Sequence, residues 1–349
     1  MSQNTPLTTA QHSKNTMQEH PFAQYIRIIG KGKTGSRSLT EQEAYDAFRM
    51  ILNGDVLDVQ IGAFLMLLRV KEEAIDELVG FTKAVKDDFV QSSRFDASCK
   101  LQIDLDWSSY AGKRKHYPWF LLSALTLAQH GYRVFMHGVA SHTAQRLYTE
   151  DVLTALGYPI CHTQQQVAHA LEQSHFAYMP LQALSPRLHD FMQLRPILGL
   201  RSPIHTLVRL FNPFNAPATL QAIFHPAYRP THQQSAQRLG YLNSAVIKGE
   251  GGEFERNPDA KTLVCSVKQS EFLDYELPKR TPNRSPAEDC FDLDLFKNVW
   301  LGKQSHEYGE MAIIDTLVIA LRTMNVVHDT EQAQQLAEQL WHTRHHAGK

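Results

Sequence analysis

The sequence lacks most features of secreted, membrane-spanning and zinc-binding proteins. Its 349 residues contain only four cysteines, which lie far apart and form no CxxC pair, so neither disulfides nor a structural zinc site is expected. No run of 18 apolar residues is present, which argues against a membrane span. Residues 1–21 have no apolar segment of the kind a secretory signal needs, and they read as a disordered tail. A reduced, cytoplasmic protein is expected.

The chain also lacks the positive excess of many nucleic-acid-binding proteins, since its formal net charge is −1. The charges are nevertheless unevenly distributed. Residues 1–40 carry five Lys or Arg and one acid, and residues 185–240 carry six arginines and one acid. Residues 41–100 hold twelve acids and seven bases. These counts fit a local basic surface, but they also fit arginines scattered over several faces, which composition alone slightly favours.

The N-terminal part reads as helical. Thr40 to Glu43 forms a capping-box pattern that opens a helix ending near Asn53-Gly54. An apolar helix is predicted over 58–70 and an amphipathic helix over 72–88. Residues 22–90 are therefore expected to form a small helical domain.

Residues 91–349 read as an α/β domain. Short apolar runs predict strands at 101–105, 133–138, 218–224, 244–249 and 262–267. Helix-like segments lie between them, the first over 118–130, and the tail at 305–325 and 330–346 is helical. This alternation predicts a mostly parallel central sheet with helices on both faces.

The segment GKGKTG at 30–35 matches a dinucleotide-binding pattern only formally, because no strand precedes or follows it. It also fails as a P-loop, since Arg27 stands where that motif requires glycine. Two interpretations remain: a flexible linker, or a mobile basic loop that contacts phosphates through Lys31, Lys33 and Arg37. The residues alone favour the linker.

The segment Asp106 to Trp119, DWSSYAGKRKHYPW, stands where α/β enzymes place a phosphate-binding loop, yet it has one glycine. Lys113, Arg114 and Lys115 could neutralise phosphates, and neighbouring aromatic rings could stack on unpaired bases. The alternative is a solvated basic turn, with Trp119 packed in the core at the start of a helix. Trp119 is expected in the core.

Other candidates are single residues. His137 ends a predicted strand, where ligands bind in α/β sheets, although a lone histidine there is more often structural. Arg195 could clamp a carboxylate or phosphate, or bind loop carbonyls. Glu250 and Glu253 could bind a hard metal ion, but a solvated Gly-rich turn is the simpler interpretation.

The order of these segments resembles the anthranilate phosphoribosyltransferase family. The helical opening at 39–81 carries the most specific likeness, supported by MHG (136–138), EDVLTALG (150–157), RPILGLRSPIHTLVRLFNP (195–213) and VIKGEGGEFE (246–255). The resemblance spans roughly residues 25–325. It implies a helical domain, a larger α/β domain and a homodimer that forms through the helices.

The family's catalytic motifs are altered. The enzymes hold phosphoribosyl pyrophosphate on a GTGGD loop, where this chain has DWSSYAGK. Their Asn-Ser-Thr motif, Lys-His-Gly-Asn motif and magnesium-binding Asp-Glu pair correspond here to Tyr117 to Phe120, Met136 to Val139, and Glu253-Phe254. Metal and hydrogen-bond donors take the developing charge in such transfers, so these losses argue against catalysis.

The altered segments resemble instead the second, YbiB-type branch of the family, whose members keep the fold and bind nucleic acid. The likeness rests on IIGKGKTGSRSLT, SYAGKRK, MHG, HTLVRL and KGEGGE. It implies a catalytically degenerate homodimer without a cofactor that binds nucleic acid, mainly single-stranded, with little sequence preference. The binding residues would be Lys113, Arg114, Lys115, Lys31, Lys33, Arg37, Arg201 and Arg209.

Two alternatives remain open. An active enzyme would be a phosphoribosyltransferase or related glycosyltransferase for an aromatic or heterocyclic acceptor. In it, Arg195 would orient the acceptor, His137 would lie near the ribose, and Glu250 or Glu253 would bind Mg²⁺. A dimeric scaffold for a protein partner is also conceivable, but no motif supports it.

Overall fold

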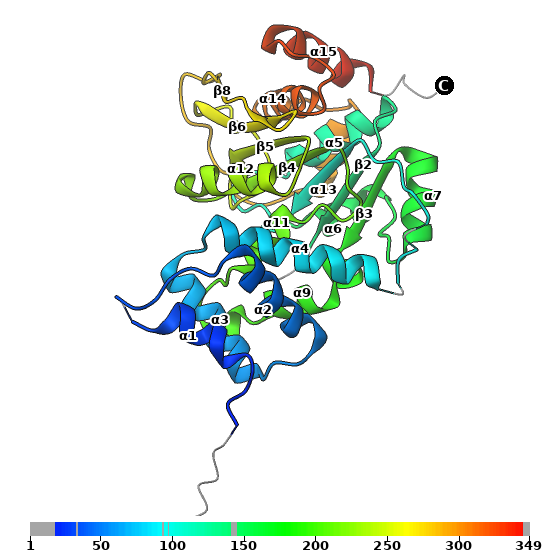
Figure 1. The fold of residues 1–349 in the computed structure, drawn as a ribbon. Coiled ribbons are helices and arrows are strands. Elements are labelled where there is room, and N and C mark those ends of the chain that lie inside the picture. The colour runs from blue at the N-terminus through cyan, green and yellow to red at the C-terminus, as the bar shows by residue number, and fades with distance from the viewer. Residues whose placement is uncertain (1–17, 33, 93, 97, 141–144, 345–349) are drawn as a thin grey trace, which may run out of the picture.

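The computed structural model describes residues 18–32, 34–92, 94–96, 98–140 and 145–344. The N-terminal part forms the helices α1 (Ala23–Gly30), α2 (Glu41–Asn53), α3 (Asp58–Lys71) and α4 (Ile75–Gln91), shown in blue and cyan in Figure 1. The predicted capping box opens α2: the Glu43 N–H donates to Thr40 Oγ1, and the Thr40 N–H donates to the Glu43 carboxylate. Gly54, in the left-handed conformation, ends it. The predicted helices are confirmed, and α1 is an additional one.

Four short helices from later in the chain join this helical layer: α8 (Leu181–Leu184), α9 (Pro186–Gln193), α10 (Arg195–Leu198) and α11 (Ile204–Leu210). One apolar core contains side chains from both segments, including Phe64 and Phe81 from the first and Leu188 and Phe191 from the second. The domain boundary expected between residues 90 and 91 stays a prediction, because the helical layer draws on both sides of it.

The sheet is mostly parallel, as predicted. Its strands are β1 (Leu105–Ser109), β2 (Val134–Gly138), β3 (Phe176–Pro180), β4 (Ala218–Ile223), β5 (Asn243–Lys248), β6 (Thr262–Lys268), β7 (Glu271–Phe272) and β8 (Tyr275–Leu277). The order is β3-β2-β1-β4-β5-β6-β7, and β8 pairs with β6. Strands β1 to β5 are parallel, whereas β6 runs antiparallel to β5 and to both β7 and β8.

The first strand lies later than predicted. It begins at Leu105, where the predicted strand 101–105 ends, so that prediction is wrong in position. The prediction fails because β1 contains polar residues although all of its residues are buried. Their polar groups have partners inside the protein: Asp106 lies 3.2 Å from His137, and the Ser109 hydroxyl forms a hydrogen bond with Thr149. The segment Asp106 to Trp119 is therefore part strand, and its loop is Tyr110 to Pro118.

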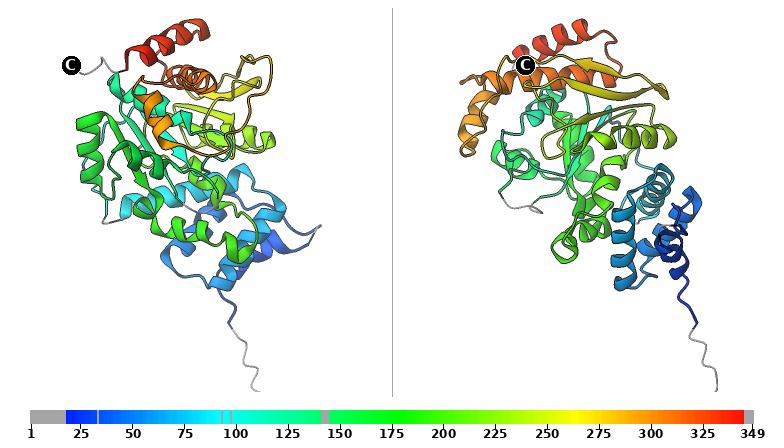
Figure 2. Two further views of the ribbon diagram at one scale, coloured as in Figure 1. Left: turned by 180° about the vertical axis from the view of Figure 1, so that it is seen from behind. Right: turned by 90° about the vertical axis from the view of Figure 1, so that its left-hand side faces the viewer.

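Two groups of helices cover the sheet. One face packs against α5 (Trp119–Gln129), α6 (Thr149–Leu156), α13 (Leu293–Trp300), α14 (Glu307–Thr323) and α15 (Thr330–Thr343). The other packs against α7 (Gln164–Ser174), α11 and α12 (Arg229–Arg238), with α4 beyond α12. Figure 2 shows the N-terminal helices and the C-terminal helices at opposite ends of the molecule.

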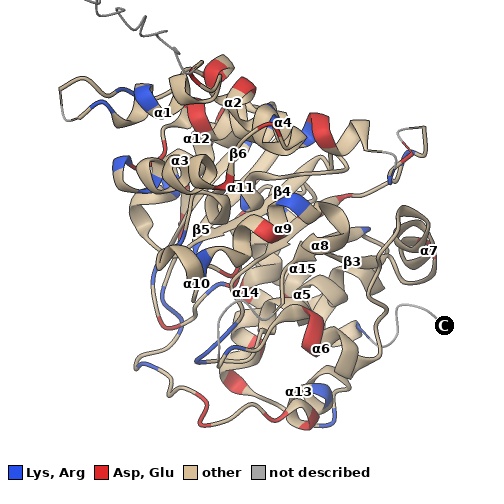
Figure 3. Ribbon diagram, turned by 90° about the horizontal axis from the view of Figure 1, so that it is seen from below, with Lys and Arg blue, Asp and Glu red and all other residues tan. Residues whose placement is uncertain are grey.

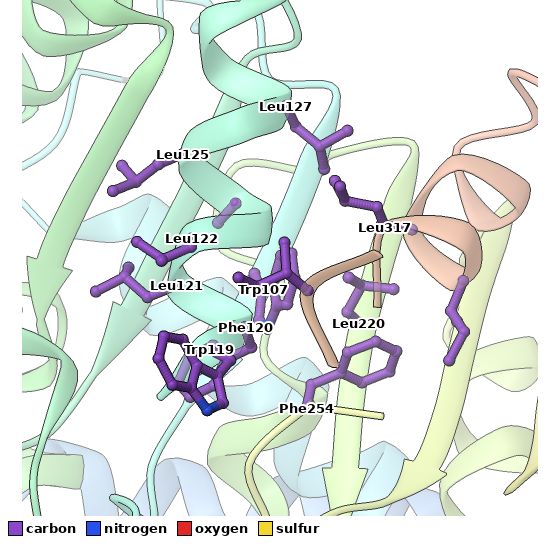
Figure 4. Close-up of a cluster of buried hydrophobic side chains, with 14 of the residues drawn as sticks. Trp107, Trp119, Phe120, Leu121, Leu122, Leu125, Leu127, Leu220, Phe254 and Leu317 are labelled. Atoms are coloured by element: carbon purple, nitrogen blue, oxygen red, sulfur yellow. The ribbon is translucent and has the colours of Figure 1, made fainter. Parts of the chain in front are cut away.

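The larger core lies between β1, β4, α5 and α14, where Trp107, Phe120, Phe254 and Leu317 meet (Figure 4). Trp119 is fully buried and stacks on Phe296 with ring centroids 5.2 Å apart, so its predicted core position is confirmed. Among the residues described, no helix combines the length and apolar character that crossing a membrane requires.

Candidate functional site

The candidate site lies at the carboxyl ends of the parallel strands, where the strand order reverses. Strand β1 has β2 on one side and β4 on the other, and ligands of open α/β sheets bind at such a point. Three loops meet there: residues 110–118 after β1, 224–228 after β4 and 249–257 after β5. In related α/β folds, backbone N–H groups of the loop after the first strand bind phosphate. The loop at residues 110–118 therefore determines whether a phosphate can bind here in the same way.

Glutamates from the loop after β5 occupy the hydrogen-bond donors of the loop after β1. The buried Glu253 carboxylate accepts from the N–H groups of Ala111 at 2.5 Å and Gly112 at 2.6 Å. The buried Glu255 carboxylate accepts from the N–H of Phe120 at 2.9 Å, at the start of α5. Phosphate-binding loops offer such N–H groups to a ligand. Here the chain supplies the anions itself.

Lys113 lies between two of these glutamates. Its side chain is 1% exposed, and its Nζ lies 2.5 Å from Glu255 and 3.1 Å from Glu250. Glu250 also accepts from the backbone N–H groups of Arg114 at 3.1 Å and Lys115 at 2.7 Å. Burial alone would lower the pKa of Lys113, but the two carboxylates outweigh it and raise the pKa.

The predicted phosphate contact by Lys113 is therefore corrected: its ammonium group is buried and paired with carboxylates. The predicted metal ligands Glu250 and Glu253 are likewise engaged by N–H groups of the loop. No cluster of three or more His, Cys, Asp or Glu side chains that could hold a metal ion occurs in the described part of the chain. The loop N–H groups bind Oε1 of each glutamate, so magnesium binding by Glu250 or Glu253 stays a prediction.

His137 does not reach a ligand either. It is fully buried, with Nδ1 2.5 Å from the Tyr110 hydroxyl and Nε2 3.2 Å from Asp106 Oδ1. Burial raises the pKa of Asp106, although the imidazole beside it acts in the opposite direction. This network holds the His137 ring inside the sheet, and its position near a ribose stays a prediction.

Arginines gather beside the filled loop. A cavity of about 110 Å³ is lined by Arg69 from α3 and by Arg201 and Arg209 from the segment around α11. Burial lowers the pKa of Arg201, and the nearby positive charges of Arg195, Arg146 and Arg69 lower it further. Five guanidinium groups from three parts of the chain thus concentrate positive charge at one place.

Negative charge in this cavity is small. Burial raises the pKa of Glu73, the carboxylate among its lining residues, which favours the neutral form. Arg209 donates to the His205 carbonyl, and burial lowers its pKa to about 10 despite the opposing charge of Glu253. Gly251 and Gly252 have φ of 68° and 101°; a Cβ there would lie 2.5 Å from Arg146 and 3.1 Å from Arg209. Glycine thus allows the loop after β5 to approach the arginines.

A second cavity of about 560 Å³ adjoins the first, and both are lined by Phe224 and His225. Its basic lining residues are Lys113, Lys115, Arg229, Lys248, Lys261 and Arg284, and its acidic ones are Glu250, Glu255 and Asp259. We call the two adjoining cavities the basic groove. Figure 3 shows Lys and Arg segments near α3 and α10.

Several groove cations lack protein partners. The side chains that make neither a hydrogen bond nor an ion pair with any described residue are Lys115, Arg201, Arg229, Lys248 and Arg284. Among the N-terminal helices and their loops, by contrast, Arg37, Lys71 and Lys83 are paired with carboxylates. The groove thus holds five cations without a protein partner in the described part of the chain.

The six arginines of residues 185–240 fall into two groups, those in or beside the groove and those that bind elsewhere. Four lie in the groove or beside it: Arg195, Arg201, Arg209 and Arg229. The other two bind elsewhere: Arg187 donates to the Ile51 carbonyl, and Arg238 pairs with Glu41 and Asp76. The scattered-arginine interpretation thus holds for two of the six.

The remaining predicted residues form a looser set. Arg114 and Lys31 are exposed, and Arg37 is exposed but paired with Glu43 at 2.6 Å. Lys71 donates to Ser38 at 3.0 Å, which places this loop beside the C-terminal end of α3. Lys33 lies outside the described residues. No contact places Lys31 or Arg37 in the groove.

Sequence reasoning missed Arg69, Arg146, Arg229, Lys248 and Phe224. Phe224 and Lys248 could have been found, because they end the predicted strands 218–224 and 244–249, at the edge where ligands bind. No comparable signal marks Arg69, which ends a strongly apolar helix.

Comparison with known proteins agrees with this architecture. Residues 23–88 match the helical bundle domain of a glycosyl transferase family, and residues 120–343 match the α/β domain of such a family. The chain belongs to this glycosyl transferase family. Within it, the relatives are anthranilate phosphoribosyltransferase-like proteins that include a YbiB-type branch.

The Escherichia coli protein YbiB is 30% identical over 240 residues, which cover 68% of this chain and 73% of YbiB. The anthranilate phosphoribosyltransferase of Methylocella silvestris is 28% identical and covers 86% of each chain. The Thermus thermophilus enzyme has a similar structure, with a TM-score of 0.75 at 20% identity over 93% of this chain and 95% of that one. The Saccharomyces cerevisiae enzyme in complex with PRPP and Mg has a TM-score of 0.73 at 16% identity, covering 94% and 95%. These structural likenesses show a shared fold.

Proposed function

We propose that this protein binds nucleic acid, mainly single-stranded and with little sequence preference, in the basic groove. The observation that carries the proposal is the group of five groove cations without a protein partner. In this proposal the protein acts in the cytoplasm as a catalytically degenerate member of its family. The binding residues are Lys115, Arg201, Arg229, Lys248 and Arg284, with Arg209 and Arg114 beside them.

The physical argument is electrostatic. The positive charges around Arg201 repel it and help lower its pKa, and a polyanion laid along the groove relieves that repulsion. Each phosphate that binds a cation also releases condensed counterions, which favours binding at low salt. Contacts of this kind are made to the backbone and carry little sequence information.

A homodimer through the helical layer belongs to the same proposal. Val59 on α3 and Ile197 on α10 are 77% and 79% exposed. A Cβ at Gly62 of α3 would lie 3.8 Å from Leu198 of α10, so the two helices adjoin. Exposed apolar side chains on neighbouring helices are typical of subunit interfaces. Two grooves in one dimer would increase avidity for a strand that spans both.

The first test is a titration of a labelled single-stranded oligonucleotide, followed by fluorescence anisotropy at several salt concentrations. We expect sub-micromolar binding at low salt and a salt slope of several ions, because several phosphates are held together. Binding no tighter than millimolar at low salt would contradict the proposal.

The second candidate function is magnesium-dependent phosphoribosyl transfer to an aromatic or heterocyclic acceptor. Its support is the likeness to the Methylocella enzyme over 86% of both chains and to the yeast enzyme that binds PRPP and Mg. Arg195 would orient the acceptor. One observation weighs against this function: N–H groups of the loop after β1 already donate hydrogen bonds to Glu250 and Glu253.

Thermal unfolding with millimolar phosphoribosyl pyrophosphate and Mg²⁺ separates the two functions. A ligand that binds the native state raises the melting temperature. A magnesium-dependent rise would favour the transferase. We expect none, because the chain's own carboxylates hold the loop N–H groups.

A further inference from the structure

Phe224 is an exposed aromatic ring at the junction of the two cavities. It directly follows β4, the strand beside the point where the sheet order reverses, and it lines both parts of the groove. The residue is 49% exposed, although exposing a phenyl ring to water is unfavourable. Phe224 thus lines both cavities of the basic groove and is about half exposed.

Most other aromatic rings around the site are covered by protein, and Tyr228, which lines the first cavity, is partly buried and accepts a hydrogen bond from Arg69. Trp107 and Trp119 are fully buried, and Tyr308 is 7% exposed. His225, the neighbour of Phe224, has its ring centroid 4.8 Å away with the planes at 85°, an edge-to-face contact that covers at most one face of the phenyl ring. A flat ligand ring can therefore approach Phe224.

Cations flank this ring. Arg69 and Arg201 line the first cavity together with Phe224 and His225, and Arg229 and Lys248 line the second together with the same two residues. Successive phosphates of a strand lying along the groove would bind on the two sides, and the nucleotide between them would place its base at the ring. Exposed aromatic rings within positive grooves bind single strands by such stacking.

We propose that Phe224 is the stacking platform for one unpaired base and gives the groove its preference for single-stranded over duplex nucleic acid. The inference rests on the proposed function and identifies the residue that selects the strand form. In a duplex, both faces of each base are covered by neighbouring base pairs, so a base must leave the stack to contact the ring. The phosphates of both forms remain available to the groove cations.

The test compares Phe224→Leu with Phe272→Leu, using a single-stranded oligonucleotide and a duplex of equal length. Phe272 is a matched control, because this residue is also 49% exposed but lies on β7, outside the lining of both cavities. We expect Phe224→Leu to weaken single-strand binding about tenfold, with the duplex affinity and the salt slope unchanged. Phe272→Leu should change neither affinity, and Phe224→Trp should retain the preference.

The outcomes separate this inference from the proposed function. If the wild-type protein binds both forms but Phe224→Leu leaves single-strand affinity unchanged, the stacking role is wrong and the groove function stands. Equal weakening on single strand and duplex, or equal weakening by Phe272→Leu, also overturns it. Absence of wild-type binding to either form overturns both proposals.

Discussion

The loop after β1 and the basic groove beside it differ in how their charges are balanced. In the loop, Lys113 and the nearby N–H groups are bonded to three glutamates within the protein. In the groove, five cations have no protein partner among the residues described. A cluster of basic residues in a sequence therefore does not identify a binding surface. What matters is which of those charges remain unpaired after folding.

The largest expected effect concerns stability in the filled loop. Lys113→Met removes the cation between Glu255 and Glu250, which leaves a buried carboxylate without its partner. We expect a loss of about 3–5 kcal/mol in the free energy of unfolding, measured by urea denaturation. The matched change Arg114→Met, at the exposed neighbour, should cost less than about 0.5 kcal/mol. Similar losses for both variants would contradict the conclusion that Lys113 is buried and paired whereas Arg114 is exposed.

The next effect concerns binding in the groove. Arg201→Glu combined with Lys248→Glu should weaken oligonucleotide binding about 100-fold at 0.1 M salt and lower the salt slope by about 2. The control reverses two exposed lysines near the end of α13, Lys297→Glu with Lys303→Glu, outside both cavities. If the control weakens binding equally, only the net charge matters. Anisotropy titrations measure both variants.

A smaller effect links the groove to pH. Burial and the charge of Arg209 lower the pKa of His232 to about 3, and its Nδ1 lies 3.0 Å from Gln221 Oε1. Because the native pKa is below the unfolded one, its contribution to stability is complete above about pH 6.5 and is lost as pH falls toward 3.

Between pH 6.5 and 4.5 we expect His232 to account for about 2–3 kcal/mol of the lost unfolding free energy. His232→Asn should reduce the pH dependence by this amount, measured by urea denaturation at both pH values. An unchanged pH dependence would show that the imidazole titrates normally.

The smallest effect lies on the border between the two regions. Glu250 accepts hydrogen bonds from the loop and also lines the second cavity. Glu250→Gln keeps an acceptor but removes one negative charge, so oligonucleotide affinity should rise about threefold in anisotropy titrations at low salt. Asp289→Asn, at an exposed acid outside the groove, should have no such effect. A fall in affinity would indicate that the glutamate orders the loop for binding.

Local signals made much of the fold predictable. The Thr40 capping box and the Asn53-Gly54 end of α2 each depend on a few consecutive residues, and both are confirmed. Strand β1 was misplaced because its Asp106 and Ser109 are polar, and their burial depends on His137 and Thr149. Partners that distant in sequence leave no local pattern.

The candidate site was less predictable than the fold, because many of its residues pair with partners that are distant in the sequence. The arginines of the RPILGLR and HTLVRL segments do gather, and the sequence placed them in one stretch. Lys113 was misassigned because its partner Glu255 is 142 residues away. Basic character can be read from a sequence, but pairing between distant residues requires the fold.

The carboxylates that fill the loop after β1 also limit how this protein can change. Because Lys113, Glu250, Glu253 and Glu255 satisfy one another or the same backbone groups, replacing any one leaves polar groups unsatisfied. A stepwise route from this loop to one that holds pyrophosphate passes through less stable proteins. Several substitutions would therefore have to occur together to reopen the loop, because each one alone lowers the stability of the folded protein.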